Sequence, residues 1–157
     1  NLDSHAVGLI EETLQRVERE LARYGQDEQR YGLIHADLRL ANLLVDQEQT
    51  HVIDFDDCGF GWYMHDLAAA LSFYEHHERL NDWIEHWLAG YVTVAPLSAE
   101  DIAMIPTFII QPRIRVLAWI GSHADTQQAR SIGAGWVRQS VELCQRYLNG
   151  EFAKVAV

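Results

Sequence analysis

Residues 7–24 carry an apolar stripe with the period of an α-helix. Its apolar members recur at steps of three and four: Val7, Ile10, Leu14, Val17, Leu21 and Tyr24. Side chains at these steps share one helix face, so the stripe predicts a helix of about five turns that packs on a core. Gly25 follows the last member, and glycine is common just past a helix end.

Shorter apolar runs follow this helix, and two of them predict β-strands. Residues Tyr31–Ile34 form one run, which leads into a polar loop. Residues 42–46 and 51–55 predict two strands, and the polar linker 47–50 joins them into a hairpin. The Gly59-Phe60-Gly61 segment predicts a flexible turn. The hairpin is therefore the main β-element that we expect.

The remainder of the chain is predicted to be helical. Asp66 stands where an N-cap is expected, before an apolar helix over residues 67–74. A second helical stripe consists of Trp83, Ile84, Trp87, Leu88 and Tyr91.

Residues 98–101 (Ser-Ala-Glu-Asp) match a capping box that opens a third helix. Pro106 and Pro112 are expected to break or kink it. A last helix is predicted for Gln127–Leu148, with its middle weakened by two glycines. The expected fold class is mainly α with a small β-hairpin (α+β).

Composition narrows the class of protein further. The 157 residues suit a single domain, 1–157, and no apolar run approaches the 18 residues that a membrane span needs. Two isolated cysteines form no disulfide framework, which favours a reducing cytoplasm. The formal net charge of -11 argues against nucleic acid, whose phosphates require a basic surface.

The most informative segment is residues 35–42, His-Ala-Asp-Leu-Arg-Leu-Ala-Asn, with Asp54-Phe55 twelve residues beyond Asn42. The pattern H-x-D-L-x-x-x-N followed by D-F matches the catalytic and metal loops of kinases. Phosphoryl transfer needs a carboxylate facing the attacking hydroxyl, and Asp37 is the candidate. Magnesium prefers hard oxygen ligands, which Asn42 and Asp54 can supply. The predicted co-substrate is ATP.

Residues 33–38 (LIHADL), 52–57 (VIDFDD) and 65–68 (HDLA) resemble the aminoglycoside phosphotransferase and choline kinase group of the protein-kinase-like superfamily. The similarity is greatest to its bacterial phosphotransferases and homoserine-kinase-like members. The resemblance implies the fold of the carboxyl-terminal lobe of such a kinase. It also implies that Asp37 is the catalytic base and that Asn42 and Asp54 hold magnesium, with Asp56 assisting the metals.

Roles for four further residues follow from the same resemblance. Leu44 and Ile53 would face the adenine ring from below. Asp66 would bond to backbone amides of the catalytic loop, and His35 would brace that loop without acting as the base.

Arg39 lies two residues after Asp37, where protein Ser/Thr kinases carry a lysine that touches the γ-phosphate. Arg39 would neutralise charge there through its two-pronged guanidinium. The alternative is an exposed arginine on a loop, and the sequence favours neither.

Two parts of a protein-kinase fold have no counterpart in this sequence. There is no A-P-E motif, and only eleven residues separate Asp54 from Asp66, so we expect no switching by loop phosphorylation. There is also no glycine-rich loop and no V-A-I-K lysine. We therefore expect a carboxyl-terminal lobe without its ATP-clamp lobe: a fragment, a truncated gene product or half of a split assembly. Such a lobe should turn over little, and its exposed inter-lobe face could support a homodimer.

The predicted reaction is phosphorylation of a hydroxyl on a small molecule, such as a homoserine-, choline- or aminoglycoside-like acceptor. The alternatives are the lobe of a bacterial protein Ser/Thr kinase and a non-catalytic binding module.

Side chains for the acceptor are harder to predict. Aromatic residues could form a wall for a cation, with Trp62 and Tyr63 favoured by their position after the metal loop. Arg113 and Arg115 could hold an acceptor carboxylate or pair with internal acids.

Overall fold

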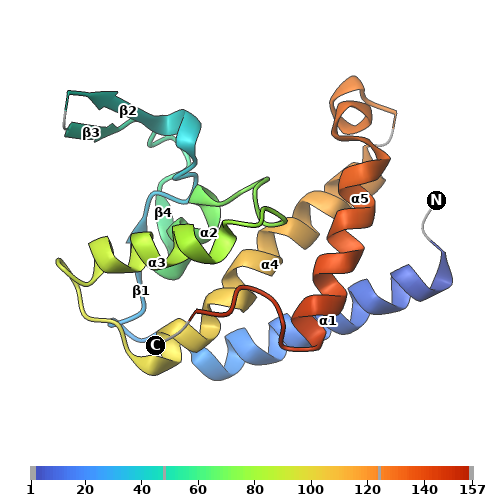
Figure 1. The fold of residues 1–157 in the computed structure, drawn as a ribbon, viewed down its shortest axis with the longest axis horizontal. Coiled ribbons are helices and arrows are strands. Elements are labelled where there is room, and N and C mark those ends of the chain that lie inside the picture. The colour runs from blue at the N-terminus through green and yellow to red at the C-terminus, as the bar shows by residue number, and fades with distance from the viewer. Residues whose placement is uncertain (1–2, 48, 124, 156–157) are drawn as a thin grey trace.

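The computed structural model describes residues 3–47, 49–123 and 125–155 (Figure 1). Its elements, in chain order, are α1 (Ser4–Tyr24), β1 (Tyr31–Ile34), a 3-10 turn η1 (Leu40–Asn42), β2 (Leu43–Asp46), β3 (Gln49–Val52), β4 (Gly59–Trp62), α2 (Met64–Ala70), α3 (Leu80–Tyr91), α4 (Ala99–Ser122) and α5 (Gln127–Leu148). Helices dominate, and the strands form two small antiparallel pairs at one end of the molecule.

Helix α1 forms where the apolar stripe predicts it. Asp3 caps its start, because the carboxylate accepts a hydrogen bond from the backbone N–H of Ala6 at 2.8 Å. Gly25 ends it with φ of 75°, and its N–H donates to the carbonyl of Leu21. Val17 and Tyr24 are buried, whereas Val7 remains partly exposed. Part of the stripe therefore packs on the core as predicted.

The predicted turn around Gly59 is a strand, which corrects the sequence prediction. Strand β4 pairs antiparallel with β1, so that Gly32 lies opposite Gly61 and Leu33 opposite Phe60. A side chain on Gly61 would overlap that of Ile34. The glycine therefore allows close packing within a strand and does not mark a turn.

The hairpin of β2 and β3 is present, but its second strand is earlier and shorter than predicted. Strand β3 begins at Gln49 and ends at Val52, whereas the sequence predicts a strand over residues 51–55. Asp54 has φ of 65°, in the left-handed region, and this conformation cannot continue an extended strand. Residues 53–55 therefore leave the hairpin as a loop.

Helix α2 also differs from its prediction. It begins at Met64, with Tyr63 at the N-cap, and ends at Ala70. Asp66 lies in the first turn of the helix and is not its N-cap, because its carboxylate binds another segment instead. Residues 71–73, which were expected to continue the helix to residue 74, form a turn instead, and Phe73 adopts φ of 71° there.

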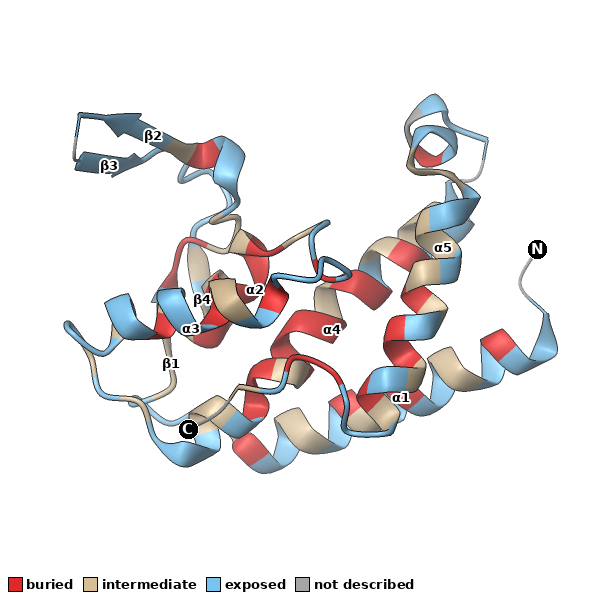
Figure 2. Ribbon diagram, viewed as in Figure 1, coloured by how far each residue is buried: buried red, intermediate tan, exposed pale blue. Residues whose placement is uncertain are grey.

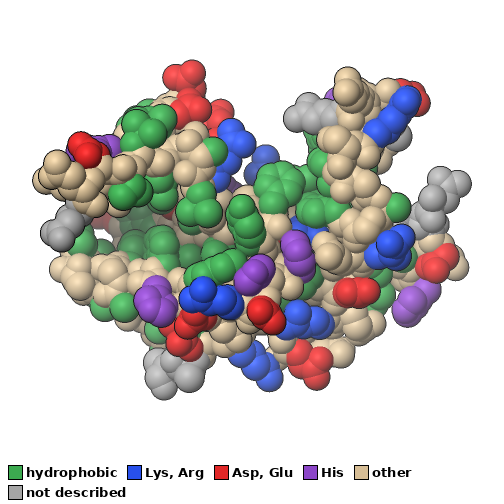
Figure 3. Space-filling model, turned by 45° about the horizontal axis from the view of Figure 1, so that its top comes forward, with side chains coloured by type: hydrophobic (Ala, Val, Ile, Leu, Met, Phe, Trp, Pro, Cys, Tyr) green, Lys and Arg blue, Asp and Glu red, His purple; other side chains and the backbone are tan. Residues whose placement is uncertain are grey.

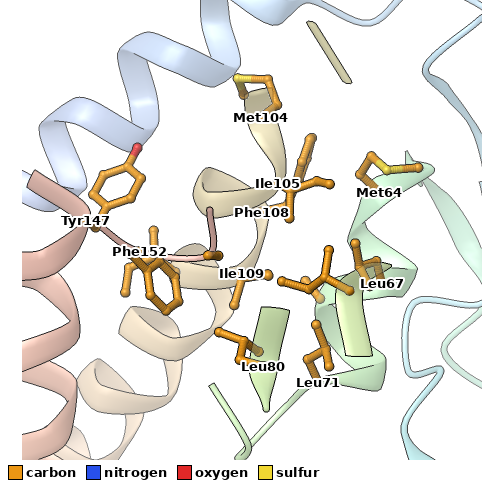
Figure 4. Close-up of a cluster of buried hydrophobic side chains, with 14 of the residues drawn as sticks. Met64, Leu67, Leu71, Leu80, Met104, Ile105, Phe108, Ile109, Tyr147 and Phe152 are labelled. Atoms are coloured by element: carbon orange, nitrogen blue, oxygen red, sulfur yellow. The ribbon is translucent and has the colours of Figure 1, made fainter. Parts of the chain in front are cut away.

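The core is centred on α4, which packs against α1, α2 and α5 (Figure 2). Its buried side chains point in several directions, as expected for a helix enclosed by neighbours. In Figure 4, Ile105, Phe108 and Ile109 of α4 meet side chains of α2 such as Leu67. This cluster fixes α2, and with it the loop that α2 supports.

The ends and interruptions of the last two helices are partly as predicted. The capping box at Ser98 and Asp101 is present. Helix α4 continues unbroken through Pro106 and Pro112, because packing on three sides compensates for the backbone hydrogen bonds that proline removes. Gly133 interrupts α5 with φ of 78°, where the glycine pair predicts a weak point.

No helix in the described part of the chain is both long enough and apolar enough to cross a membrane.

Candidate active site

The loop between β1 and β2 is held by the carboxylate of Asp66. This carboxylate accepts hydrogen bonds from the backbone N–H of His35 at 2.9 Å and of Ala36 at 2.8 Å. Ala36 has φ of 68°, an unfavourable conformation for alanine that the two bonds help to maintain. The expected anchoring role of Asp66 matches this contact. The strained residue directly precedes Asp37, so the strain lies at the proposed reacting group.

His35 braces the same loop from inside. It is buried, its Nε2 lies 3.0 Å from the carbonyl oxygen of Ile53, and its Nδ1 lies 3.3 Å from the backbone nitrogen of Asp37. A neutral imidazole with its proton on Nε2 satisfies both contacts, because Nδ1 then accepts the bond from Asp37. The ring therefore connects the catalytic loop to the loop after β3 and is fully engaged, as expected for a brace.

Asp37 sits between an amide and a guanidinium. Its Oδ2 accepts hydrogen bonds from Asn42 Nδ2 and Arg39 Nε, each at 2.9 Å. Asn42 Nδ2 also donates to the backbone carbonyl of Asp37 at 2.9 Å. Because the side-chain nitrogen of Asn42 donates both of these hydrogen bonds, the side-chain oxygen points away from Asp37 and can act as an acceptor. Arg39 is half exposed on the loop and contacts Asp37; its predicted contact with a phosphate remains a prediction.

The two predicted acidic metal ligands follow the hairpin. The backbone N–H of Ile53 donates to the carbonyl of Asn42 at 3.0 Å, which places Asp54 one residue beyond this contact. Asp54 and Asp56 are both exposed. No three or more His, Cys, Asp or Glu side chains gather into a metal-binding group among the described residues. An amide oxygen with one or two carboxylates nevertheless fits magnesium, which usually takes its remaining ligands from water and phosphate.

Leu44 and Ile53 are apolar residues close to the candidate metal ligands in the chain. Leu44 lies in β2, opposite His51, and Ile53 directly follows β3 and precedes Asp54. Leu44 is 53% exposed and Ile53 39% exposed. Both branched side chains are therefore accessible.

His65 adds a titratable group behind the loop. Burial lowers the pKa of this histidine from its ordinary value, and Arg115 acts in the same direction. The Asp66 carboxylate and a hydrogen bond to the backbone of Ala36 partly oppose the shift. His65 is therefore neutral at pH 7, and it supports the strained residue before Asp37.

A pocket of about 360 Å³ opens beside the catalytic loop. Its walls are Leu40 of η1, Leu67 and Leu71 at α2, and Trp83 and Trp87 of α3. In Figure 3, hydrophobic side chains line a hollow below the hairpin on this face. Tyr74 completes the wall between α2 and α3. Leu40 follows Asp37 by three residues and Leu67 follows Asp66 by one, so the pocket adjoins the loop.

The favoured aromatic candidates lie elsewhere. Trp62 packs near Phe108, and its Nε1 donates to the carbonyl of Gly25 at 2.6 Å. The hydroxyl of Tyr63 donates to the carbonyl of Glu28 at 3.3 Å. Both residues thus join α1 and its following loop to the sheet. Trp62 ends β4, Tyr63 follows it at the N-cap of α2, and both pack against the hydrophobic core. Their position after the predicted metal loop in sequence therefore did not indicate this packing.

Arg113 is also unavailable to an acceptor. It is buried in an ion pair with Glu75 at 2.5 Å, and it donates to the hydroxyl of Ser140 at 2.8 Å. Its guanidinium lies 3.9 Å from the ring centre of Trp136. The internal pairing that the sequence left open is therefore the observed one.

A helical lobe with this loop, hairpin and supporting aspartate is the carboxyl-terminal lobe of a protein-kinase-like fold. The chain belongs to the phosphotransferase enzyme family, whose model matches residues 1–100. This confirms the resemblance inferred from the three sequence tracts.

Several proteins are similar to the chain. The amicoumacin kinase of Bacillus subtilis (strain 168) is 27% identical in an alignment over 99 residues that covers 57% of this chain and 30% of that protein. The homoserine kinase of Neisseria meningitidis serogroup B (strain ATCC BAA-335 / MC58) is 39% identical over 80 residues, 48% of this chain and 26% of that protein.

Two solved structures share the fold. A microcompartment-associated aminopropanol kinase superposes with a TM-score of 0.87 at 42% identity, over 98% of this chain and 49% of that one. The amicoumacin kinase hAmiN, in complex with AMP-PNP, Ca2+ and Ami, has a TM-score of 0.67 at 20% identity, over 98% of this chain and 47% of that one. The chain thus spans about half the length of the structures it matches.

Proposed function

We propose that this chain is the catalytic and acceptor-binding lobe of an ATP- and magnesium-dependent kinase that phosphorylates a hydroxyl group on a small molecule. The observation that carries the proposal is the contact of Asp37 with Asn42, 2.9 Å between Oδ2 and Nδ2. It puts a carboxylate and an amide of the kinase pattern into one unit, on a loop that Asp66 holds rigid.

Asp37 is assigned the role of catalytic base. One of its carboxylate oxygens is engaged by Asn42 and Arg39, and within the described chain Oδ1 has no hydrogen-bond partner. That oxygen can accept the proton of an acceptor hydroxyl while the engaged one keeps the side chain in place. The main requirement is the orientation of the Asp37 carboxylate, because the loose transition state of phosphoryl transfer depends on positioning and charge neutralisation.

Asn42, Asp54 and Asp56 are assigned to magnesium, and Leu44 and Ile53 to the adenine ring. Magnesium, when bound, would neutralise charge on the phosphates. The left-handed backbone at Asp54 is the second strained residue of the site and turns the chain away from the hairpin. The exposed apolar side chains of Leu44 and Ile53 are suited to contact a flat base.

Arg39 is assigned to the transferring phosphoryl group. In the structure it pairs with Asp37, and a guanidinium can exchange one carboxylate partner for the oxygens of a phosphate. Such an exchange would free the base when the nucleotide arrives.

A small-molecule acceptor is favoured over a protein substrate by the named relatives, which include amicoumacin, homoserine and aminopropanol kinases. The strands expose large apolar side chains, such as Leu33, Val45 and Phe60, which supports a partner that covers them. The partner is either the ATP-clamp lobe or a second copy of this chain in a homodimer.

The test is transfer of labelled γ-phosphate from ATP to a panel of small alcohols and amino alcohols by the full-length protein, with magnesium and with EDTA. Magnesium-dependent labelling of a hydroxyl compound is expected. A protein that binds ATP and magnesium but labels only serine or threonine in protein substrates would contradict the small-molecule proposal. A protein that binds neither would favour a non-catalytic module.

A further inference from the structure

The pocket beside the catalytic loop has an unusual charge character for a chain of net charge -11. Its wall contains no Asp, Glu, Lys or Arg side chain. Leucine, alanine and aromatic residues form nearly all of it, and His86 supplies the only imidazole. A bound ammonium or carboxylate would therefore lose its water here without gaining a charged partner, which is costly.

The two acidic residues of α3, Asp82 and Glu85, are not among the residues that line the pocket. The carboxylate of Asp82 is also paired, because it accepts hydrogen bonds from Arg79 Nε at 3.1 Å and from Arg79 Nη2 at 2.8 Å. The ring of His86 is held as well, because its Nδ1 lies 2.7 Å from the backbone carbonyl of Asp82. No free carboxylate of α3 thus lines the pocket to receive an amine.

The aromatic rings of the wall are fixed by their neighbours. Trp83 stacks on His77 with ring centres 4.5 Å apart and meets Tyr74 edge to face at 6.0 Å. Trp87 stacks on Tyr91 at 4.8 Å. A wall held in this way is a preformed apolar surface, which is the usual character of a small-molecule site.

We propose that this pocket binds the apolar body of the phosphate acceptor, an alkyl or aryl group attached to the carbon skeleton that carries the reacting hydroxyl. The proposal rests on the proposed kinase function and adds the chemical class of the acceptor. Leu40 joins the two parts of the site, because it lines the pocket and lies in the loop that holds Asp37 and Asn42. An acceptor seated against Leu40 therefore extends its hydroxyl end towards the loop.

The volume limits the size of this body. A pocket of about 360 Å³ corresponds to roughly twelve water molecules at about 30 Å³ each. The apolar body is thus a short alkyl chain or a single small ring system. A polycationic oligosaccharide fits neither the size nor the charge.

The first experiment measures binding to the full-length protein by calorimetry, without ATP, so that it does not depend on turnover. The probes are 2-phenylethanol, an alcohol with an apolar body, and glycerol, an alcohol without one. Leu40→Asp places a carboxylate on the exposed rim of the pocket and should weaken 2-phenylethanol binding about tenfold or more. Val94→Asp, at an apolar side chain that is 90% exposed beyond α3, is the matched control and should leave binding unchanged.

A second variant, Ala70→Phe, fills the pocket from α2 and should also reduce binding of 2-phenylethanol, with circular dichroism confirming that the protein is folded. Equal binding of glycerol and 2-phenylethanol, or equal losses in Leu40→Asp and Val94→Asp, would overturn the pocket assignment. Pocket-dependent binding in a protein that transfers no phosphate would support the pocket and count against the kinase function. Phosphate transfer that neither pocket variant affects would support the kinase function and count against the pocket assignment.

Discussion

Arg39 forms an ion pair with Asp37 in which Arg39 Nε lies 2.9 Å from Asp37 Oδ2. The arginine side chain thus contacts the proposed base directly. It is half exposed and has no other hydrogen-bond partner among the described residues. In the proposed function this arginine neutralises charge on the transferring phosphoryl group. The pair would then join the base and the neutralising cation within three residues of the chain.

Replacing Arg39 with Ala should reduce kcat by roughly 100-fold, as the loss of one transition-state donor commonly does. Nucleotide affinity should change much less, because the arginine contacts the phosphates mainly during transfer. Steady-state kinetics and nucleotide titration of the full-length protein separate the two effects. Arg23→Ala, an exposed arginine of α1, serves as the control. An unchanged kcat in the Arg39 variant would leave Arg39 as a surface residue.

His65 should make stability depend on pH. Its pKa is lowered in the folded protein by burial, whereas in the unfolded chain it returns to about 6.5. The unfolded state therefore binds the proton first as pH falls, and the free energy of unfolding decreases below about pH 6.5. The contribution is fully present above that pH and is lost as pH falls through the folded pKa.

Urea denaturation at pH 7.5 and pH 5.5 measures this effect. His65→Asn should show a smaller difference between the two pH values than the wild type, while His5→Asn, at an exposed position of α1, should match the wild type. Identical pH dependence in all three proteins would exclude His65 as the source.

The buried ion pair of Glu75 and Arg113 should be costly to break. Both side chains are almost fully buried, at 4% and 0% exposed. Glu75→Ala leaves the guanidinium without its counter-charge, which typically costs about 3–5 kcal/mol of stability. The double variant Glu75→Leu/Arg113→Met removes both charges and should be more stable than the sum of its single variants. Strictly additive losses in chemical denaturation would show that the pair is not coupled.

The sequence predicts the elements whose signals are local. The stripe of α1, the capping box at Ser98 and the weak point at Gly133 appear as expected. Asp66 shows the limit of such reasoning. Its position before an apolar run suggests an N-cap, but its carboxylate binds the amides of His35 and Ala36, some thirty residues away in sequence. The family resemblance predicts this contact, whereas local propensity does not.

Contacts between distant segments account for the remaining errors. Gly59–Trp62 pairs with Tyr31–Ile34 across about thirty residues, so its glycines resemble a turn until the partner strand is known. The pocket proposed for the acceptor also has no local signal. Trp83 and Trp87 occur at helical spacing, which usually indicates a core, and only the position of Leu40 across from them reveals an opening.

The most direct test of the account is the effect of Asp37→Asn on phosphate transfer by the full-length protein. Asparagine keeps the shape of the side chain and removes its ability to accept a proton, so kcat should fall by about 10²–10⁴-fold. ATP and magnesium binding should persist, and Asp46→Asn, at the exposed end of β2, should retain full activity. Transfer at the wild-type rate by Asp37→Asn would contradict the assignment of Asp37 as the base and, with it, the proposed mechanism.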